Sequence, residues 1–217
     1  MDADFEADAV ADAIADAAFG RLREAWESGT DADLPAALTA LARRDHAPAC
    51  AALATALLSG RPPFPQDPAT AFVWALRGAH GGFAVAQALA GDFYLHAEPE
   101  HGACVRDVSQ AARWHVAAAE AGHAGAALAA SDAFRMGRGV PRDFRRAAYF
   151  LGLCTALDPA PPGITALLRP SLATDLGEDT LAEVDRAVAA AVAALPRRDA
   201  DLEGFWLACA ASGRGAS

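Results

Sequence analysis

The feature that most constrains the fold of this chain is a repeat that occurs three times between residues 46 and 158. The copies start at His46, Phe83 and His123, and matching residue types recur at fixed distances from these starts. Alanine stands three residues on, a small residue eight on and a large apolar residue eleven on: Ala49, Ala86 and Ala126; Ala54, Gly91 and Ser131; Leu57, Tyr94 and Phe134. A period of this length is typical of helix pairs that stack on one another.

The second half of each copy begins at an aspartate. Asp67, Asp107 and Asp143 are 40 and 36 residues apart. An alanine follows each after four residues and an aromatic residue after seven: Ala71, Ala111 and Ala147; Trp74, Trp114 and Phe150. We predict that the aspartates are helix N-caps and that Gly82 and Gly122 are the left-handed residues that end helices. The alanine and the aromatic residue share a helical face, so each ring can lie over a small residue of a neighbouring helix.

Composition agrees with helices throughout. Hydrophobic residues make up 53% of the chain, and many of them are alanine, which has the highest helix propensity. Alternating patterns of β-branched residues, which would indicate strands, are hard to find. We therefore expect an all-α fold, an α-α superhelix or solenoid of antiparallel helix pairs, with three clear repeats and degenerate capping helices.

The pattern divides the chain into three parts. Residues 1–45 are predicted to form N-terminal capping helices, at about 5–28 (with Val10, Ile14, Ala18, Leu22 and Trp26 on or near one face) and 34–44. The repeats occupy 46–82, 83–122 and 123–158. Residues 159–217 are predicted to hold one or two helical turns over 164–168, a capping helix over 179–195 and a short helix containing Phe205 and Trp206.

One stretch carries a family resemblance. The sequence HAGAALAASDAFRMGRGVPRDFRRAAYFLGLC (123–154) resembles the Sel-1-like repeat family, which is related to tetratricopeptide repeats. Its hallmarks are the turn Gly137-Arg138-Gly139-Val140, Asp143 and the pair Ala147-Ala148, and residues 107–122 match the second half of such a repeat. The first copy departs from the pattern, because PPFP replaces the glycine turn, and the loop of the second copy is four residues longer than that of the third. The resemblance covers about 46–157 and implies protein–protein interaction and scaffolding.

Charge and cysteine content exclude several classes of protein. The net charge is −10 and the pI is about 4.9, which argues against nucleic-acid binding and favours a partner with a basic segment. Six acids and no base fall in residues 1–16, which argues against a secretory signal, and no apolar run is long enough for a membrane span. The four cysteines (Cys50, Cys104, Cys154 and Cys209) are widely spaced, as expected for reduced thiols in the cytoplasm. All basic residues are arginine, which is typical of a GC-rich bacterial genome.

The first helix of each pair usually lines the concave face of such a solenoid. The positions between its core residues are then expected to meet a partner peptide or helix: Gln87 and Asp92 in the second copy, Asp132 and Arg135 in the third, and Thr55 and Leu58 in the first. Asp92 and Asp132 occupy equivalent positions, which predicts an acidic stripe. The main hypothesis is therefore a cytoplasmic adaptor that binds protein, without catalysis and without a cofactor.

Two alternatives remain open at this point. The loop of the second copy holds His96, Glu98, Glu100, His101 and Cys104, which could bind zinc or support a metal-dependent or hydrolytic activity. A structural subunit that docks through its acidic first helix is the other alternative. No familiar catalytic motif occurs, so no catalytic residue is assigned. His46 and His123 are expected to start helices, and His115 is expected at a packing boundary.

Overall fold

The computed structural model describes residues 13, 15–22, 24, 33–60, 62–97, 103–158 and 162–195. None of these described residues lies in a β-strand, and the all-α fold class is confirmed. Residues 15–22 are helical. The elements that follow are α2 (Leu34–Arg43), α3 (Ala47–Ser59), α4 (Pro68–His80), α5 (Ala84–His96), α6 (Val108–Glu120), α7 (Ala124–Met136), α8 (Phe144–Leu157), α9 (Pro162–Leu176) and α10 (Glu178–Ala194).

Local capping explains where the repeat helices begin and end. The carboxylates of Asp67, Asp107 and Asp143 accept hydrogen bonds of 2.9 to 3.0 Å from backbone N–H groups in the first turns of α4, α6 and α8. The Nδ1 atoms of His46 and His123 accept in the same way at the starts of α3 and α7, at 3.3 and 3.0 Å. Each cap of this kind stabilises a helix by about 1 kcal/mol. Gly82 and Gly122 have φ angles of 81° and 94°, so the predicted helix ends are confirmed.

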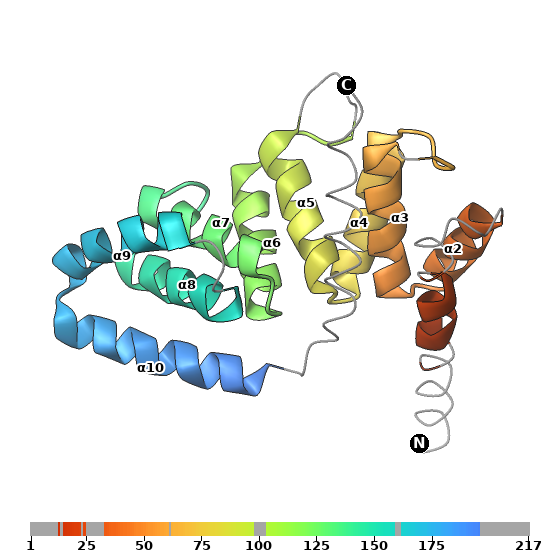
Figure 1. Ribbon diagram of the computed structural model, residues 1–217. Helices are drawn as coiled ribbons and strands as arrows, with labels where there is room; N and C mark the ends of the chain where they lie inside the picture. The colour runs from red at the N-terminus through yellow and green to blue at the C-terminus, as the bar shows by residue number, and fades with distance from the viewer. Residues whose placement is uncertain are drawn as a thin grey trace, which may run out of the picture.

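The helices stack in neighbouring pairs. Figure 1 shows α3 with α4, α5 with α6 and α7 with α8 side by side in one row. The row is continuous, because α4 packs on α5 and α6 packs on α7. Helix 15–22 and α2 lie at one end of the row, and α9 and α10 lie at the other. This arrangement is the predicted solenoid of helix pairs.

Small and aromatic residues form the contacts between these helices. Ala71, Ala111 and Ala147 are completely buried or nearly so. Phe150 is 1% exposed, and its ring stacks on that of Phe134 with 5.6 Å between centroids. Trp74 and Trp114 are partly buried, and they pack against the core formed by buried residues of helix 15–22 and of α2 to α5. The rings therefore pack between helices, as the repeat predicts, although the two indoles keep part of their surface in water.

A glycine turn holds the third repeat close to the second. Gly137 and Gly139 have φ angles of 69° and 74°, which favour glycine. A β-carbon on Gly139 would lie 2.1 Å from the carbonyl oxygen of Val108 at the start of α6. The turn following α7 therefore rests directly on the backbone of the preceding pair, and glycine is required there for two independent reasons.

The capping regions agree with the prediction in part. The capping helix expected over 179–195 is α10, with an expected apolar stripe of Leu181, Val184, Val188, Val192 and Leu195. The first three of these are buried, and the last two are only partly buried. In helix 15–22, Ala15 and Phe19 are buried, whereas Ala18 and Leu22 are only partly buried. The buried residues Ala15 and Phe19 thus each come one position after a residue of the expected face. Val10, Ile14, Trp26 and the final segment with Phe205 and Trp206 lie outside the described residues.

The prediction for α9 was wrong in its length. One or two turns were expected over 164–168, but the helix runs to Leu176 with Pro170 inside it. A proline inside a helix removes one backbone hydrogen bond and usually ends the helix. Here Leu172, two residues later, is 1% exposed, and burial of this side chain helps to hold the last turns in place. None of the described helices combines the length and apolarity needed to cross a membrane.

Gly91 leaves room for a side chain of α6 to approach α5. A β-carbon on Gly91 would lie 2.4 Å from Cδ2 of His115. His115 is 3% exposed, so its ring is buried in the stack and does not lie at a packing boundary as expected. The imidazole fills the space that the small residue of the second copy leaves open.

We expect Gly91→Ala to destabilise the protein by about 1–3 kcal/mol, because the added methyl group displaces the His115 ring. Gly20→Ala is the matched control, since Gly20 is helical and a β-carbon there meets no atom within 4 Å. It should leave stability unchanged or raise it by up to about 1 kcal/mol. Urea denaturation compares the two, and equal stability of both variants would contradict the contact.

The thiol of Cys50 is buried in α3, as expected. Its side chain is fully buried, and Sγ donates a hydrogen bond to the carbonyl oxygen of Ala42 at 3.4 Å. Burial raises the pKa of Cys50 from 9.0 to about 11, because the thiolate loses its hydration in an apolar site. The folded protein therefore keeps this proton at a pH where the unfolded chain releases it.

This difference predicts a loss of stability in base. Between pH 9 and pH 11 the unfolded chain binds fewer protons at Cys50 than the folded protein, so the free energy of unfolding falls as pH rises. The expected loss is about 2 kcal/mol. Cys50→Ala lacks this contribution, so denaturant titrations at both pH values should show a smaller loss in the variant. Parallel losses in the two proteins would show that Cys50 is not responsible.

Candidate partner-binding surface

A cavity of about 250 Å³ lies between α3 and α5. Leu58, Leu89 and Phe93 contribute apolar side chains, and Asp92 is the carboxylate among the described residues of the lining. The rest of the lining is neutral or weakly basic and consists of Gln66, Pro68, His96, Ala97 and Ala103. Leu58 is 38% exposed, so an apolar side chain remains accessible to water here. We call this feature the α3–α5 cavity.

Asp92 connects the cavity to the interior of the stack. Its Oδ1 lies 3.1 Å from Nε2 of His115, which is the hydrogen-bond donor in this arrangement. The Asp92 side chain is 61% exposed, whereas that of His115 is 4% exposed. The carboxylate is thus held in position by a buried ring while one side of it faces solvent. His115 also lines a second cavity, of about 90 Å³, together with Asp132 and Arg138.

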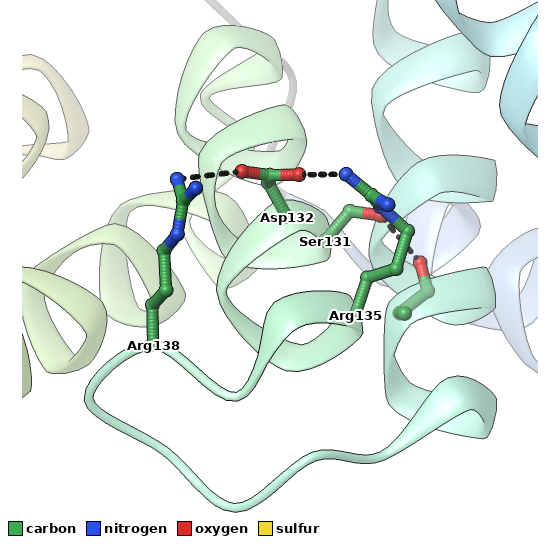
Figure 2. Close-up of polar contacts among 5 residues, drawn as sticks. Ser131, Asp132, Arg135 and Arg138 are labelled. Carbon is green, nitrogen blue, oxygen red and sulfur yellow. Dashed lines mark hydrogen bonds and ion pairs between the residues drawn. The ribbon is translucent and has the colours of Figure 1, made fainter.

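The equivalent aspartate of the third repeat has different partners. Figure 2 shows Asp132 between Arg135 and Arg138, at 2.5 Å from Nη2 of the first and 3.4 Å from Nη1 of the second. Ser131, beside it, donates a hydrogen bond to the carbonyl oxygen of Ala147 at 2.8 Å. Two guanidinium groups thus oppose one carboxylate. Within the predicted stripe, Asp92 is the carboxylate that forms no ion pair with an arginine of the described chain.

The other expected contact positions do not lie together at the α3–α5 cavity. Gln87 is half-buried and donates to the carbonyl oxygen of Ala79 at 3.4 Å, and its own oxygen is buried without a hydrogen-bond partner. Thr55 donates to Ala51 at 3.0 Å within its own helix. Neither Gln87 nor Arg135 lines the two cavities described above. The structure therefore brings Leu58 and Asp92 together at one cavity, and it pairs Asp132 with Arg135 at another position.

The described part of the proposed metal loop gives no support for a metal site. Among the described residues, no three His, Cys, Asp or Glu side chains come together as metal ligands would. His96 is exposed at the α3–α5 cavity. Sγ of Cys104 donates to the carbonyl oxygen of Phe93 at 3.4 Å, and burial raises the pKa of this thiol. Glu98, Glu100 and His101 lie outside the described residues.

Two solved structures resemble this arrangement of helices. A Sel1 repeat protein from Oxalobacter formigenes aligns with a TM-score of 0.60 and 24% identity, over 69% of this chain and 43% of its own. A protective antigen present in uropathogenic Escherichia coli strains and displaying an SLR fold aligns with a TM-score of 0.64 and 18% identity, over 94% of this chain and 42% of its own. This chain has the Sel1-like repeat fold. No family model matches the sequence, and none of the curated proteins matches it.

The Sel1-like repeat fold accounts for the positions of the candidate residues. The chain spans less than half the length of either solved structure. Within it, the first helices of successive pairs are close enough for α3 to contact α5 directly, and the α3–α5 cavity opens along this line of contact. Leu58 and Asp92 were predicted on these helices from the repeat pattern, but the hydrogen bond between His115 and Asp92 was not. The available signal was a histidine eight residues after Asp107.

Asp92 should contribute to stability through His115. Asp92→Ala removes the acceptor for a buried imidazole and should cost about 1–3 kcal/mol. Asp92→Asn keeps an oxygen acceptor at the same place and should cost less than half as much. Urea denaturation of both variants measures the difference, and equal effects would show that the hydrogen bond makes no contribution.

Proposed function

We propose that this chain is a protein-interaction scaffold that binds a peptide or helix of a partner protein along the first helices of its repeats, α3, α5 and α7. The observation that carries the proposal is the α3–α5 cavity, where the exposed Leu58 and the partly buried Leu89 and Phe93 share the lining with the Asp92 carboxylate, which is held by His115. Binding sites of this type are concave and mainly apolar, with few polar groups that set orientation. The Sel1-like repeat fold supports a binding function rather than catalysis, by analogy of fold.

The lining of the cavity indicates the chemistry of the partner. Leu58, Leu89 and Phe93 suit one leucine-sized or phenylalanine-sized side chain, because the space measures about 250 Å³. Asp92 favours a lysine or arginine close to this apolar anchor, and the net charge of −10 favours a basic partner at longer range. Gln87, Asp132 and Arg135 complete the proposed surface beyond the cavity. Their side chains already have partners within the chain but can still form hydrogen bonds with the backbone of a bound protein.

Site-specific photo-crosslinking tests this function. A benzophenone amino acid replaces Leu58 at the cavity or, as control, Val73 on α4, which is 61% exposed. Proteins captured from an extract of the native host by the unmodified chain are then irradiated with each variant. We expect one captured protein to crosslink at position 58 and not at position 73. Crosslinking at position 73 alone would place the partner on another face and overturn the proposal.

The partner identified in this way permits a quantitative test of Asp92. Asp92→Asn removes the charge but keeps an acceptor for His115, so folding should be preserved. We expect it to weaken binding of the crosslinked partner by about two- to tenfold, in line with one exposed charge interaction. Asp175→Asn is the matched control, since Asp175 is exposed on α9 at the end of the stack. Equal affinities of the two variants would remove Asp92 from the binding surface.

A further inference from the structure

One segment of this acidic protein is strongly basic. Five of the eighteen arginines fall within residues 135–146, at the end of α7, in the glycine turn and at the start of α8. They are Arg135, Arg138, Arg142, Arg145 and Arg146, and we call this segment the arginine turn. Such a concentration of one charge produces a local positive field even where the net charge of the chain is −10.

Nearby carboxylates compensate only part of this charge. Asp132 alone faces both Arg135 and Arg138 (Figure 2). Arg145 pairs with Glu183 of α10 at 2.7 Å. Asp143 accepts a hydrogen bond from the backbone of α8 as its N-cap. The arginine turn therefore keeps an excess of positive charge after these pairs are formed.

The excess is located at Arg142 and Arg146. Both are exposed, and their guanidinium groups lie over the rings of Phe144 and Phe134, at 4.4 and 4.5 Å from the centroids. Among the described residues, no carboxylate forms an ion pair with either of them. A guanidinium that lies over a ring is held in position and can still present N–H groups to a carboxylate. Two such groups four residues apart in the chain suit a ligand with several carboxylates.

The chain itself contains a segment of this chemistry. Residues 1–16 hold six acids and no base. Asp4, Asp8 and Asp12 are spaced by four residues in the sequence. Asp16 continues this spacing, and its Oδ1 lies 2.9 Å from Nε2 of His46. The acidic segment is thus opposite in charge to the arginine turn.

The described end of the acidic segment and the arginine turn lie toward opposite ends of the row of helices. Helix 15–22 lies at one end, whereas α7 and α8 lie near the other end (Figure 1). Three helices, α4, α5 and α6, intervene between α3 and α7, and packed helices are about 8–10 Å apart. This separation favours a contact between two molecules over a contact within one.

We propose that the arginine turn binds the acidic segment 1–16 of a second copy of this chain. The contact joins two different surfaces, so it is a head-to-tail interface that can continue from one copy to the next. It is centred on Arg142 and Arg146, away from the α3–α5 cavity, and it does not depend on the function proposed above, although Arg135 belongs to both surfaces. Because the interacting charges are exposed, salt should weaken it strongly.

Sedimentation velocity measurements on the full chain test this association. The protein is compared over about a hundredfold range of concentration, in about 0.05 M and about 0.5 M salt. We expect the mean mass to rise with concentration in low salt, and the dissociation constant to rise by at least about tenfold in high salt. A chain that stays monomeric throughout, or an association that salt leaves unchanged, would overturn the proposal.

Charge reversal locates the interface. Arg142→Glu with Arg146→Glu, and separately Asp8→Lys with Asp12→Lys, should each abolish self-association. A mixture of the two variants should associate again, because it unites an intact acidic segment with an intact arginine turn. Arg113→Glu with Arg186→Glu changes the net charge equally at exposed positions of α6 and α10 and should not affect association. If this control pair abolishes association as well, or if the mixture stays monomeric, the proposed interface is wrong.

Discussion

The structure depends on close approach between helices, which alanine makes possible. At the helix contacts of each repeat an alanine is buried, as at Ala71, Ala111 and Ala147. Alanine alone buries little apolar area, and the hydrophobic contribution scales with the area removed from water. Large rings supply that area, above all the stacked pair Phe134 and Phe150. Small residues therefore set the distance between helices, and aromatic residues fill the space that remains between them.

Local signals could be predicted from the sequence because their partners are near in the chain. The caps at Asp67, Asp107 and Asp143 bind backbone groups two or three residues away, so the residue type and its position decide the outcome. The end of α9 could not be predicted in the same way. Local propensity at Pro170 argues against a helix there, and the burial of Leu172 that supports its last turns comes from tertiary packing.

The positions of Asp92 and Asp132 could be predicted from the sequence, but the side chains that pair with them could not. Asp92 and Asp132 are equivalent within the repeat, and the pattern therefore predicted that they would behave alike. Their neighbours differ, since the residue that follows the capping aspartate by eight is His115 in the second copy and Leu151 in the third. A histidine can bind Asp92 and a leucine cannot bind Asp132, which instead pairs with arginines. Such pairs depend on contacts between helices, which the spacing within one copy does not record.

Repeat architecture explains how one small chain can carry the two surfaces proposed above. Each pair contacts mainly its neighbours, so a change in one repeat affects the next repeat and few others. The α3–α5 cavity uses the loop and first helix of one pair with the first helix of the next, whereas the arginine turn uses the glycine turn of the third repeat. That turn rests on the backbone at Val108, which fixes its position while its arginines face outward. The same close packing that needs glycine and alanine inside the stack leaves the outer positions of the turns free to carry charge.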